Sequence, residues 1–156
     1  EDRPDSGFRL ITYPHPRQTP LADYKTLNYL FYLLAGRWAS ERDADEALIL
    51  NADHSVSETN TGNIVVIKNG QAVPPTSQHV LPGVMQTRVC ELLSDYGYTI
   101  TDAVLTRENL LTAEAAFVTN SLIGAVPVVS IDNIPVRRAP RLENKLQRHV
   151  FAEPAN

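Results

Sequence analysis

The sequence has one cysteine, no long apolar run and no excess of basic residues. The lone thiol, Cys90, excludes an internal disulfide and is typical of a reducing compartment, so we expect a cytoplasmic protein. No stretch approaches the roughly 20 apolar residues of a membrane-spanning helix, which argues against a membrane partner. Lys and Arg number 14 against 18 Asp and Glu, a net charge of −4, which argues against a nucleic-acid surface.

Several catalytic motifs are absent as well. There is no G-x-S-x-G nucleophile elbow and no G-x-x-x-x-G-K-[ST] phosphate loop. The four histidines have no i, i+4 pairing and no link to Cys90, so we expect no metal site. These histidines are His15, His54, His79 and His149.

The length of 156 residues indicates one domain, or the larger part of a two-domain protein. The first residue is Glu1 rather than Met and no signal peptide follows, so we expect a processed or truncated product. Residues 1–20 contain four prolines, and we interpret them as an extended lead-in segment with one strand over residues 8–13.

The rest of the chain alternates between helical and extended patterns. The turn Asn69-Gly70 is a strong hairpin signal, which argues against a purely parallel sheet. The clearest helix covers residues 21–40, where Leu27, Leu30, Phe31, Leu34 and Trp38 form one apolar stripe. Other helices are expected over residues 83–96, after Thr106 and over residues 142–150, and strands over residues 46–51, 56–58, 63–68, 71–73, 98–104, 115–119 and 126–131.

The stretch from His54 to Gln86 holds most of the candidate chemistry. Glu58 ends an extended run and precedes an amide-rich turn, Thr59-Asn60-Thr61-Gly62-Asn63. By position alone it is a solvated carboxylate at the end of a strand. The functional alternative is that it pairs with a pyridine nitrogen and keeps that ring protonated, so that the ring can accept electrons from a carbanion.

The same stretch ends in Leu81-Pro82-Gly83-Val84-Met85, which is typical of a helix start. Unpaired backbone N–H groups at such a start favour a phosphate, here on Val84 and Met85. Asn120-Ser121, in a turn between two strands, would add N–H and hydroxyl donors. The alternatives are plain helix initiation and an ordinary polar loop.

Lys25 is the candidate nucleophile. Its position predicts a solvated surface lysine, whereas a Schiff-base lysine would need desolvation or a nearby cation to lower its pKa. Asp43, Asp45 and Glu46 form a small acidic cluster that we expect to lie in solvent.

Six short motifs, in this order, resemble the class IV (fold type IV) pyridoxal-phosphate enzymes. That family contains branched-chain aminotransferases, D-amino acid aminotransferases and 4-amino-4-deoxychorismate lyases. The resemblance runs from about residue 8 to residue 136, and Lys25 and Glu58 are 33 positions apart (58 − 25), close to the family's spacing. The motifs are Lys25-Thr26-Leu27-Asn28-Tyr29-Leu30, Asp45-Glu46-Ala47-Leu48-Ile49-Leu50, Val56-Ser57-Glu58 with Gly62-Asn63, Leu81-Pro82-Gly83-Val84, Leu105-Thr106-Arg107-Glu108, and Thr119-Asn120-Ser121-Leu122 before Pro127-Val128.

The resemblance implies pyridoxal 5'-phosphate as cofactor and gives each candidate a role. Lys25 would form the Schiff base and shuttle the Cα proton, and Glu58 would bind the pyridine nitrogen. Leu81 would pack against the ring, and Tyr29 would approach the phenolic oxygen. The phosphate would be held by Val84, Met85, Asn120 and Ser121.

The resemblance also implies a fold and an assembly. Residues 21–156 would be the large C-terminal, cofactor-binding domain, an α/β pseudo-barrel of the α+β class. The family's small N-terminal domain would lie outside this chain. The partners would be a small-molecule amino substrate and a second copy, in a homodimer completed by that N-terminal domain.

Met85 stands where the aminotransferases usually have Thr, and Gln86 replaces a frequent Arg. Met85 and Asn120 resemble the aminodeoxychorismate lyases, which implies elimination of pyruvate from 4-amino-4-deoxychorismate to give 4-aminobenzoate for folate synthesis. A branched-chain or D-amino acid aminotransferase is the first alternative. A cofactor-free scaffold or interaction domain is the second, because the small domain's phosphate-binding arginine is not in this chain.

Overall fold

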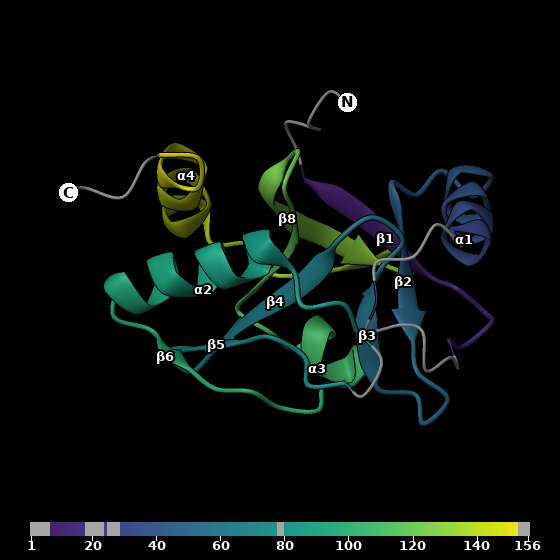
Figure 1. Cartoon of the computed structure of the whole chain (residues 1–156), viewed down its shortest axis with the longest axis horizontal. Coiled ribbons are helices and arrows are strands. Elements are labelled where there is room, and N and C mark those ends of the chain that lie inside the picture. The colour runs from purple at the N-terminus through teal and green to yellow at the C-terminus, as the bar shows by residue number, and fades with distance from the viewer. Residues whose placement is uncertain (1–6, 18–23, 25–28, 78–79, 153–156) are drawn as a thin grey trace.

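The computed structural model describes residues 7–17, 24, 29–77 and 80–152, which form one mixed sheet with helices on its outside (Figure 1). Helices α2 and α4 lie together at one end of the molecule and α1 lies at the other end. In chain order the elements are β1 (Phe8–Thr12), α1 (Leu30–Ser40), β2 (Glu46–Leu50), β3 (Val56–Thr59), β4 (Asn63–Lys68), β5 (Gln71–Val73), α2 (Val84–Asp95), β6 (Thr99–Ile100), α3 (Arg107–Leu111), β7 (Ala115–Asn120), β8 (Gly124–Ile131), β9 (Ile134–Pro135) and α4 (Pro140–His149).

The sheet is mixed, as the hairpin signal predicts. Its strand order is β3-β2-β1-β8-β7-β4-β5-β6, and β9 pairs with β8 outside that path. β1 runs parallel to both of its neighbours, β2 and β8, whereas β4, β7 and β8 pair antiparallel. The expected strand in the lead-in segment is therefore an inner strand of the sheet, and the predicted α+β class is confirmed.

The connection between β3 and β4 shows that this sheet must curl. Five strand spacings separate the two strands along the sheet, about 24 Å if it were flat. Only residues 60–62 join them, and a link of four residue steps spans at most about 14 Å. The sheet therefore folds round until β3 approaches β4, which gives the half-barrel that the pseudo-barrel prediction requires.

The curl leaves apolar layers on both faces of the sheet, and β4 shows this best. Ile64 and Val66 point into the core enclosed by the curl, together with Leu10, while Val65 and Ile67 face the layer under α2 and α4. Because both faces are covered, β4 is a continuous apolar run rather than an alternating one.

Helix α1 packs only partly through the predicted face. Ala35 and Ala39 are fully buried against Ala47 and the neighbouring β2 core, whereas Leu30 and Leu34, from the expected apolar stripe, are 63% and 49% exposed. Small side chains let the helix approach the sheet closely. The prediction was wrong for the two leucines, while Phe31 and Trp38 of the same stripe do pack against this core.

Two predicted element bounds were also wrong. The helix expected over residues 21–40 begins only at Leu30, with Tyr29 as its N-cap and Tyr24 in a bend; residues 21–23 and 25–28 lie outside the described part. The strand expected over residues 98–104 is limited to β6, because its partner β5 is short and is followed by Pro74-Pro75, which cannot donate ladder hydrogen bonds.

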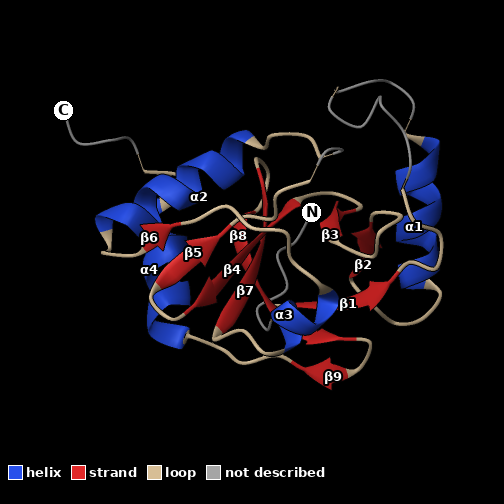
Figure 2. Cartoon of the chain, turned by 90° about the horizontal axis from the view of Figure 1, so that it is seen from below, coloured by secondary structure: helices blue, strands red, loops and turns tan. Residues whose placement is uncertain are grey.

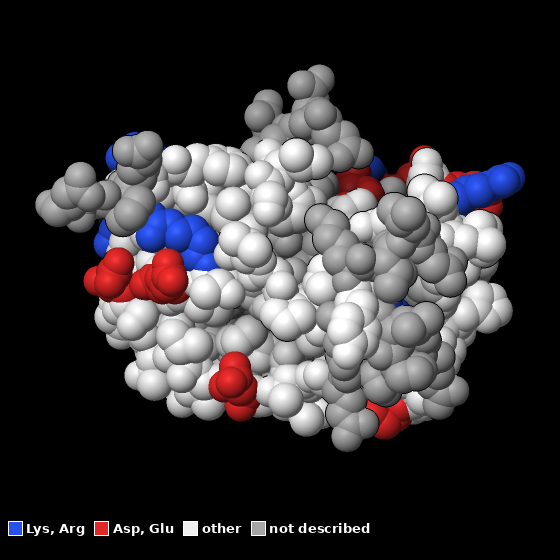
Figure 3. Space-filling view, viewed as in Figure 1, with Lys and Arg blue, Asp and Glu red and all other residues white. Residues whose placement is uncertain are grey.

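The view from below shows α3 beneath the curled sheet, with α1 and α2 on opposite sides (Figure 2). Most charged side chains on the face drawn in Figure 3 lie near its edges. Of the helices that the structure describes, none is long and apolar enough to cross a membrane. Within the same residues, no three His, Cys, Asp or Glu side chains gather as metal ligands would.

Candidate active site

An open cavity of about 820 Å³ lies between α1, the β3–β4 turn, the residues leading into α2 and the β7–β8 turn. Curling of the sheet brings these four segments together, although Arg37 of α1 and Leu122 of the β7–β8 turn are 85 positions apart (122 − 37). All the predicted site residues that the structure describes line this cavity. They are Tyr29, Glu58, Leu81, Val84, Met85, Asn120 and Ser121.

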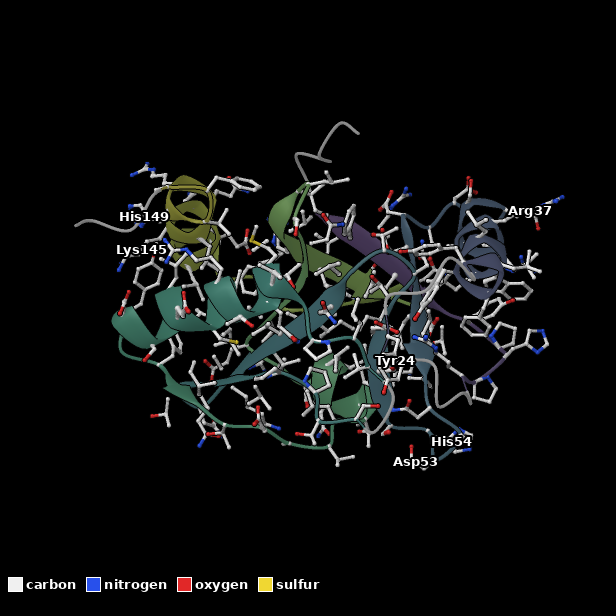
Figure 4. The ribbon with its side chains drawn as sticks, in the orientation of Figure 1. Tyr24, Arg37, Asp53, His54, Lys145 and His149 are labelled. Carbon is white, nitrogen blue, oxygen red and sulfur yellow. The ribbon has the colours of Figure 1, made fainter. Side chains whose placement is uncertain are left out.

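Lys25, the predicted Schiff-base lysine, lies outside the described residues, so its role stays a prediction. Its described neighbours Tyr24 and Tyr29 both line the cavity and are 68% and 42% exposed. In Figure 4, Arg37 lies on α1 at one end of the molecule. Lys145 and His149 lie on α4 at the opposite end.

Glu58 lies near the end of β3, beside the cavity, and is only 6% exposed. The pairing of β3 with β2 holds Glu58 at this position, where it lies opposite Ile49. The Arg17 guanidinium forms a buried ion pair with Oε1, and the Tyr32 hydroxyl donates to the same oxygen at 2.6 Å. The Arg17 guanidinium also lies over the Tyr32 ring, 4.5 Å from its centre.

Burial and pairing act in opposite directions on Glu58. Loss of water disfavours the charged form and raises the pKa of this carboxyl to about 7, while the adjacent Arg17 charge and hydrogen bond lower it. The acid is therefore poised to change its protonation near neutral pH. A protonated ring nitrogen placed beside it would favour the carboxylate form further.

Sequence reasoning missed Arg17 and Tyr32. Arg17 is only 7% exposed, and arginines are rarely buried unless they are paired. Nothing in the sequence around His15-Pro16-Arg17 indicates this burial. Tyr32 gave a weak signal, since it lies one helical turn after Tyr29 on the same side of α1. Three-residue spacing between two tyrosines beside the candidate lysine could have suggested that both face the site.

The start of α2 forms a second wall of the cavity. The first hydrogen bond within this helix runs from Thr87 N to Gly83 O at 3.0 Å, so the helix supplies no acceptor for the N–H groups of Val84 and Met85. The Asn63 amide holds the preceding residues by donating to Leu81 O at 2.9 Å. A Cβ on Gly83 would overlap Asn63 Oδ1, so any larger residue there would displace the Asn63 amide.

The β7–β8 turn forms the third wall, and Asn120 fixes its shape. Asn120 Oδ1 accepts from the N–H groups of Leu122 and Ile123, both at 3.0 Å. Its Nδ2 reaches across to Thr61 O at 3.3 Å. The Asn120 side chain is thus engaged by the protein, while Ser121 remains exposed on the cavity.

These walls suit one kind of molecule. A buried acid can hold a basic ring nitrogen, and N–H groups left unpaired by their own helix can hold a phosphate, in a space large enough for a small cofactor and substrate. Fold and site together are therefore compatible with a domain that binds a small phosphorylated molecule carrying a basic ring nitrogen.

Comparison with known proteins gives the family. The sequence model for amino-transferase class IV matches residues 2–131. A branched-chain-amino-acid aminotransferase of Salmonella typhimurium is 30% identical over 122 residues, 78% of this chain and 40% of the relative. A provisionally named branched-chain-amino-acid aminotransferase of Methanocaldococcus jannaschii is 36% identical over 133 residues, 82% of this chain and 46% of the relative. The chain belongs to the class IV aminotransferase family, whose enzymes depend on pyridoxal phosphate.

Solved structures agree on the fold. A provisionally named 4-amino-4-deoxychorismate lyase from Legionella pneumophila superposes with a TM-score of 0.85 at 31% identity, covering 94% of this chain and 56% of that one. The branched-chain amino acid aminotransferase from Escherichia coli also gives 0.85, at 27% identity, covering 95% and 52%. This chain spans about half the length of the proteins it matches.

Proposed function

We propose that the protein binds pyridoxal 5'-phosphate in the 820 Å³ cavity and uses it to transform a small amino substrate. The observation that carries this proposal is the buried Glu58, held at the cavity by Arg17 and Tyr32 in a chain of the class IV family. Burying an acid costs free energy even when it is paired, so the position of Glu58 beside the cavity favours a functional role.

When bound, the cofactor supplies an electron-withdrawing ring that stabilises negative charge at the substrate Cα. Glu58 would hold a proton on the ring nitrogen, with its carboxylate oriented by Arg17 and Tyr32. The start of α2 and the β7–β8 turn would hold the phosphate, and Leu81 would pack against the ring. Lys25 would take and return the Cα proton, which requires that its amine be neutral for part of the cycle.

The finer assignment that we favour is a pyruvate-releasing lyase acting on 4-amino-4-deoxychorismate. Met85 supports it, because this residue of the cavity offers no hydroxyl to the phosphate where the aminotransferases usually have Thr. The Legionella pneumophila structure, which carries that provisional name, supports it as well, at 31% identity over 94% of this chain.

An aminotransferase is the second candidate, and the names of the curated relatives favour it. Both relatives described above carry branched-chain aminotransferase names. A D-alanine aminotransferase of Bacillus licheniformis is also 28% identical over 85% of this chain. Such an enzyme must accept an amino acid and a keto acid in turn at one site.

Two measurements on the full natural polypeptide that carries these residues test the proposal. Added pyridoxal phosphate should give a visible Schiff-base absorption band that Lys25→Ala abolishes; no band in the unaltered protein would support a cofactor-free scaffold or interaction domain instead. Next, 4-amino-4-deoxychorismate should release pyruvate, with no amino transfer from branched-chain or D-amino acids. Amino transfer without pyruvate release would establish the second candidate.

The remaining expectations belong to this proposal. We infer a homodimer completed by an N-terminal domain, because the chain spans about half of its relatives and large apolar side chains such as Leu33 are exposed beside the cavity. A cytoplasmic location and a boundary after residue 20 also remain predictions. β1 lies in the same sheet as the rest of the domain, which argues that residues 8–12 belong to the domain rather than to a separate lead-in segment.

A further inference from the structure

We infer that Glu46 is a positioning residue for the phosphate site, acting through Thr61 and Asn120. The inference rests on the proposed function, because it concerns how the cavity holds a phosphate. Glu46 does not line the cavity itself, whereas Thr61 and Asn120 do. Its effect on a ligand must therefore pass through these two residues.

Glu46 is the first residue of β2 and is only 5% exposed. Its carboxylate accepts the Thr61 hydroxyl on Oε1 and the Thr61 backbone N–H on Oε2 at 3.2 Å. The expectation that the acidic cluster lies in solvent was wrong for Glu46, whereas Asp43 and Asp45 are exposed, with Asp45 paired to Arg9. Folding brings Glu46 within reach of Thr61 because β2 and β3 are paired.

A carboxylate suits this position better than an amide. Thr61 presents two donors, an N–H and an O–H, and an ionised carboxylate accepts on both oxygens. A glutamine offers one acceptor oxygen, so its NH₂ group would face either the Thr61 N–H, with which it cannot bond, or the Thr61 hydroxyl, which would have to change from donor to acceptor. The neighbouring Asn60 fixes the same turn to β2, since its Oδ1 accepts from Ala47 N at 2.6 Å.

The β3–β4 turn, which Glu46 and Asn60 fix to β2, also fixes the β7–β8 turn. Asn120 Nδ2 donates to Thr61 O at 3.3 Å and lies 3.4 Å from Thr61 Oγ1. Asn120 Oδ1 accepts from the N–H groups of Leu122 and Ile123. One chain of hydrogen bonds thus runs from a buried acid, through an exposed cavity residue, to the backbone on which Ser121 is presented.

The β3–β4 turn also reaches the other half of the site. Asn63, directly after the turn, donates to Leu81 O and packs against Gly83 at the start of α2. The five residues after Glu58 therefore set where both phosphate-binding walls lie relative to the acid. Glu46 anchors that segment from outside the cavity, which makes the phosphate site sensitive to a residue that never touches the ligand.

The test compares two ligands that differ only in the phosphate, pyridoxamine 5'-phosphate and pyridoxamine. Neither needs a bond to Lys25, and their dissociation constants can be measured by fluorescence on the full natural polypeptide. The unaltered protein should prefer the phosphorylated form. Glu46→Gln and Thr61→Val should each reduce that preference about tenfold, the effect of weakening roughly one hydrogen-bonding contact, while Thr61→Ser should restore it.

Glu143→Gln is the matched control. Glu143 is also a carboxylate with 5% exposure, but it lies on α4, pairs with Arg138 just before that helix and does not line the cavity. This variant should keep the full preference for the phosphorylated ligand even if its melting temperature falls.

Two outcomes would overturn the inference, and they differ in what else they affect. If the unaltered protein prefers the phosphorylated ligand and Glu46→Gln and Thr61→Val keep that preference, or lose affinity for both ligands equally, only the positioning role fails. If the unaltered protein binds neither ligand, the proposed function fails and the positioning role fails with it.

Discussion

Glu58 is a buried acid whose neighbours oppose the effect of its burial. Moving a carboxylate out of water costs several kcal/mol, and the ion pair with Arg17 returns only part of that. The pKa of Glu58 is therefore raised to about 7, whereas an exposed ion pair would lower the pKa of its carboxyl group. A single residue therefore makes the stability of the protein depend on pH near neutrality.

The sign of this dependence of stability on pH can be predicted. The folded-state pKa of Glu58 lies above the unfolded value of 4.5, so the contribution of Glu58 to stability is present below about pH 4.5 and is lost as the pH rises through about 7. A shift of this size corresponds to roughly 3 kcal/mol. Glu58→Gln should remove the effect, so its stability relative to the unaltered protein should increase between about pH 5 and pH 8 in urea unfolding.

Glu143 gives the opposite case in the same molecule. Its hydrogen bond from Arg138 lowers the pKa of this carboxyl, so its stabilising effect is present above the unfolded pKa of 4.5 and is lost only at lower pH. Glu143→Gln should therefore lower the stability by a constant amount over the same pH range. A pH-independent difference for Glu58→Gln would contradict the raised pKa.

At the scale of elements, the start of α2 depends on the close approach of two segments. Gly83 has φ −83°, a backbone conformation that any residue can adopt. A glycine is favoured here because there is little space for a side chain, not because the backbone conformation demands it. The space is taken by Asn63, which links α2 to β4. An added methyl group would push the helix start away from the β3–β4 turn.

Two glycine substitutions separate the effect of limited space from the effect of backbone conformation. Gly83→Ala should cost about 1–3 kcal/mol of stability through overpacking and should also abolish phosphate-ligand binding, because it displaces the Val84 and Met85 amides. Gly70→Ala should cost about 1–2 kcal/mol through its left-handed backbone, at φ +73°, but leave binding unchanged, because nothing lies near its Cβ. Urea unfolding and pyridoxamine 5'-phosphate titration measure both effects. Unimpaired binding by Gly83→Ala would contradict this account.

At the scale of the whole molecule, the curl of the sheet creates the site. The cavity is lined by several segments that are distant in sequence, and most of them are the ends or starts of elements fixed in the sheet or packed on it. β7 lies between β4 and β8 with both faces covered, while β6 is a two-residue strand at the end of the sheet. Rigidity should therefore decrease from the middle strands outward.

Hydrogen exchange should show this gradient. Amides of β7 should open only in global unfolding, whereas amides of β6 should exchange through local opening, at least about a thousandfold faster. Exchange followed by mass spectrometry on peptides covering residues 115–120 and 99–100 measures both. Similar rates for the two strands would contradict the described strand order.

Local features of the sequence predicted a large part of this molecule. The hairpin at Asn69-Gly70 was confirmed as the β4–β5 turn, and Thr106 caps α3 with its side chain accepting from Asn109 N. Glu58, the start of α2 and Asn120-Ser121 line one cavity with Tyr29 and Leu81, as the family resemblance implies, while their roles toward a cofactor stay predictions. Such features depend on a few adjacent residues, so their chemistry can be read directly from the chain.

Other features were decided only by the tertiary structure. Arg17 and Tyr32 meet Glu58 because β1, α1 and β3 converge, and Glu46 reaches Thr61 because β2 pairs with β3. Periodicity also could not tell which face of α1 is buried, since the sheet accepts small side chains there. The sequence by itself determined local conformation and the reactive groups, whereas long-range packing decided which groups are desolvated and paired, because burial depends on contacts that no short stretch contains.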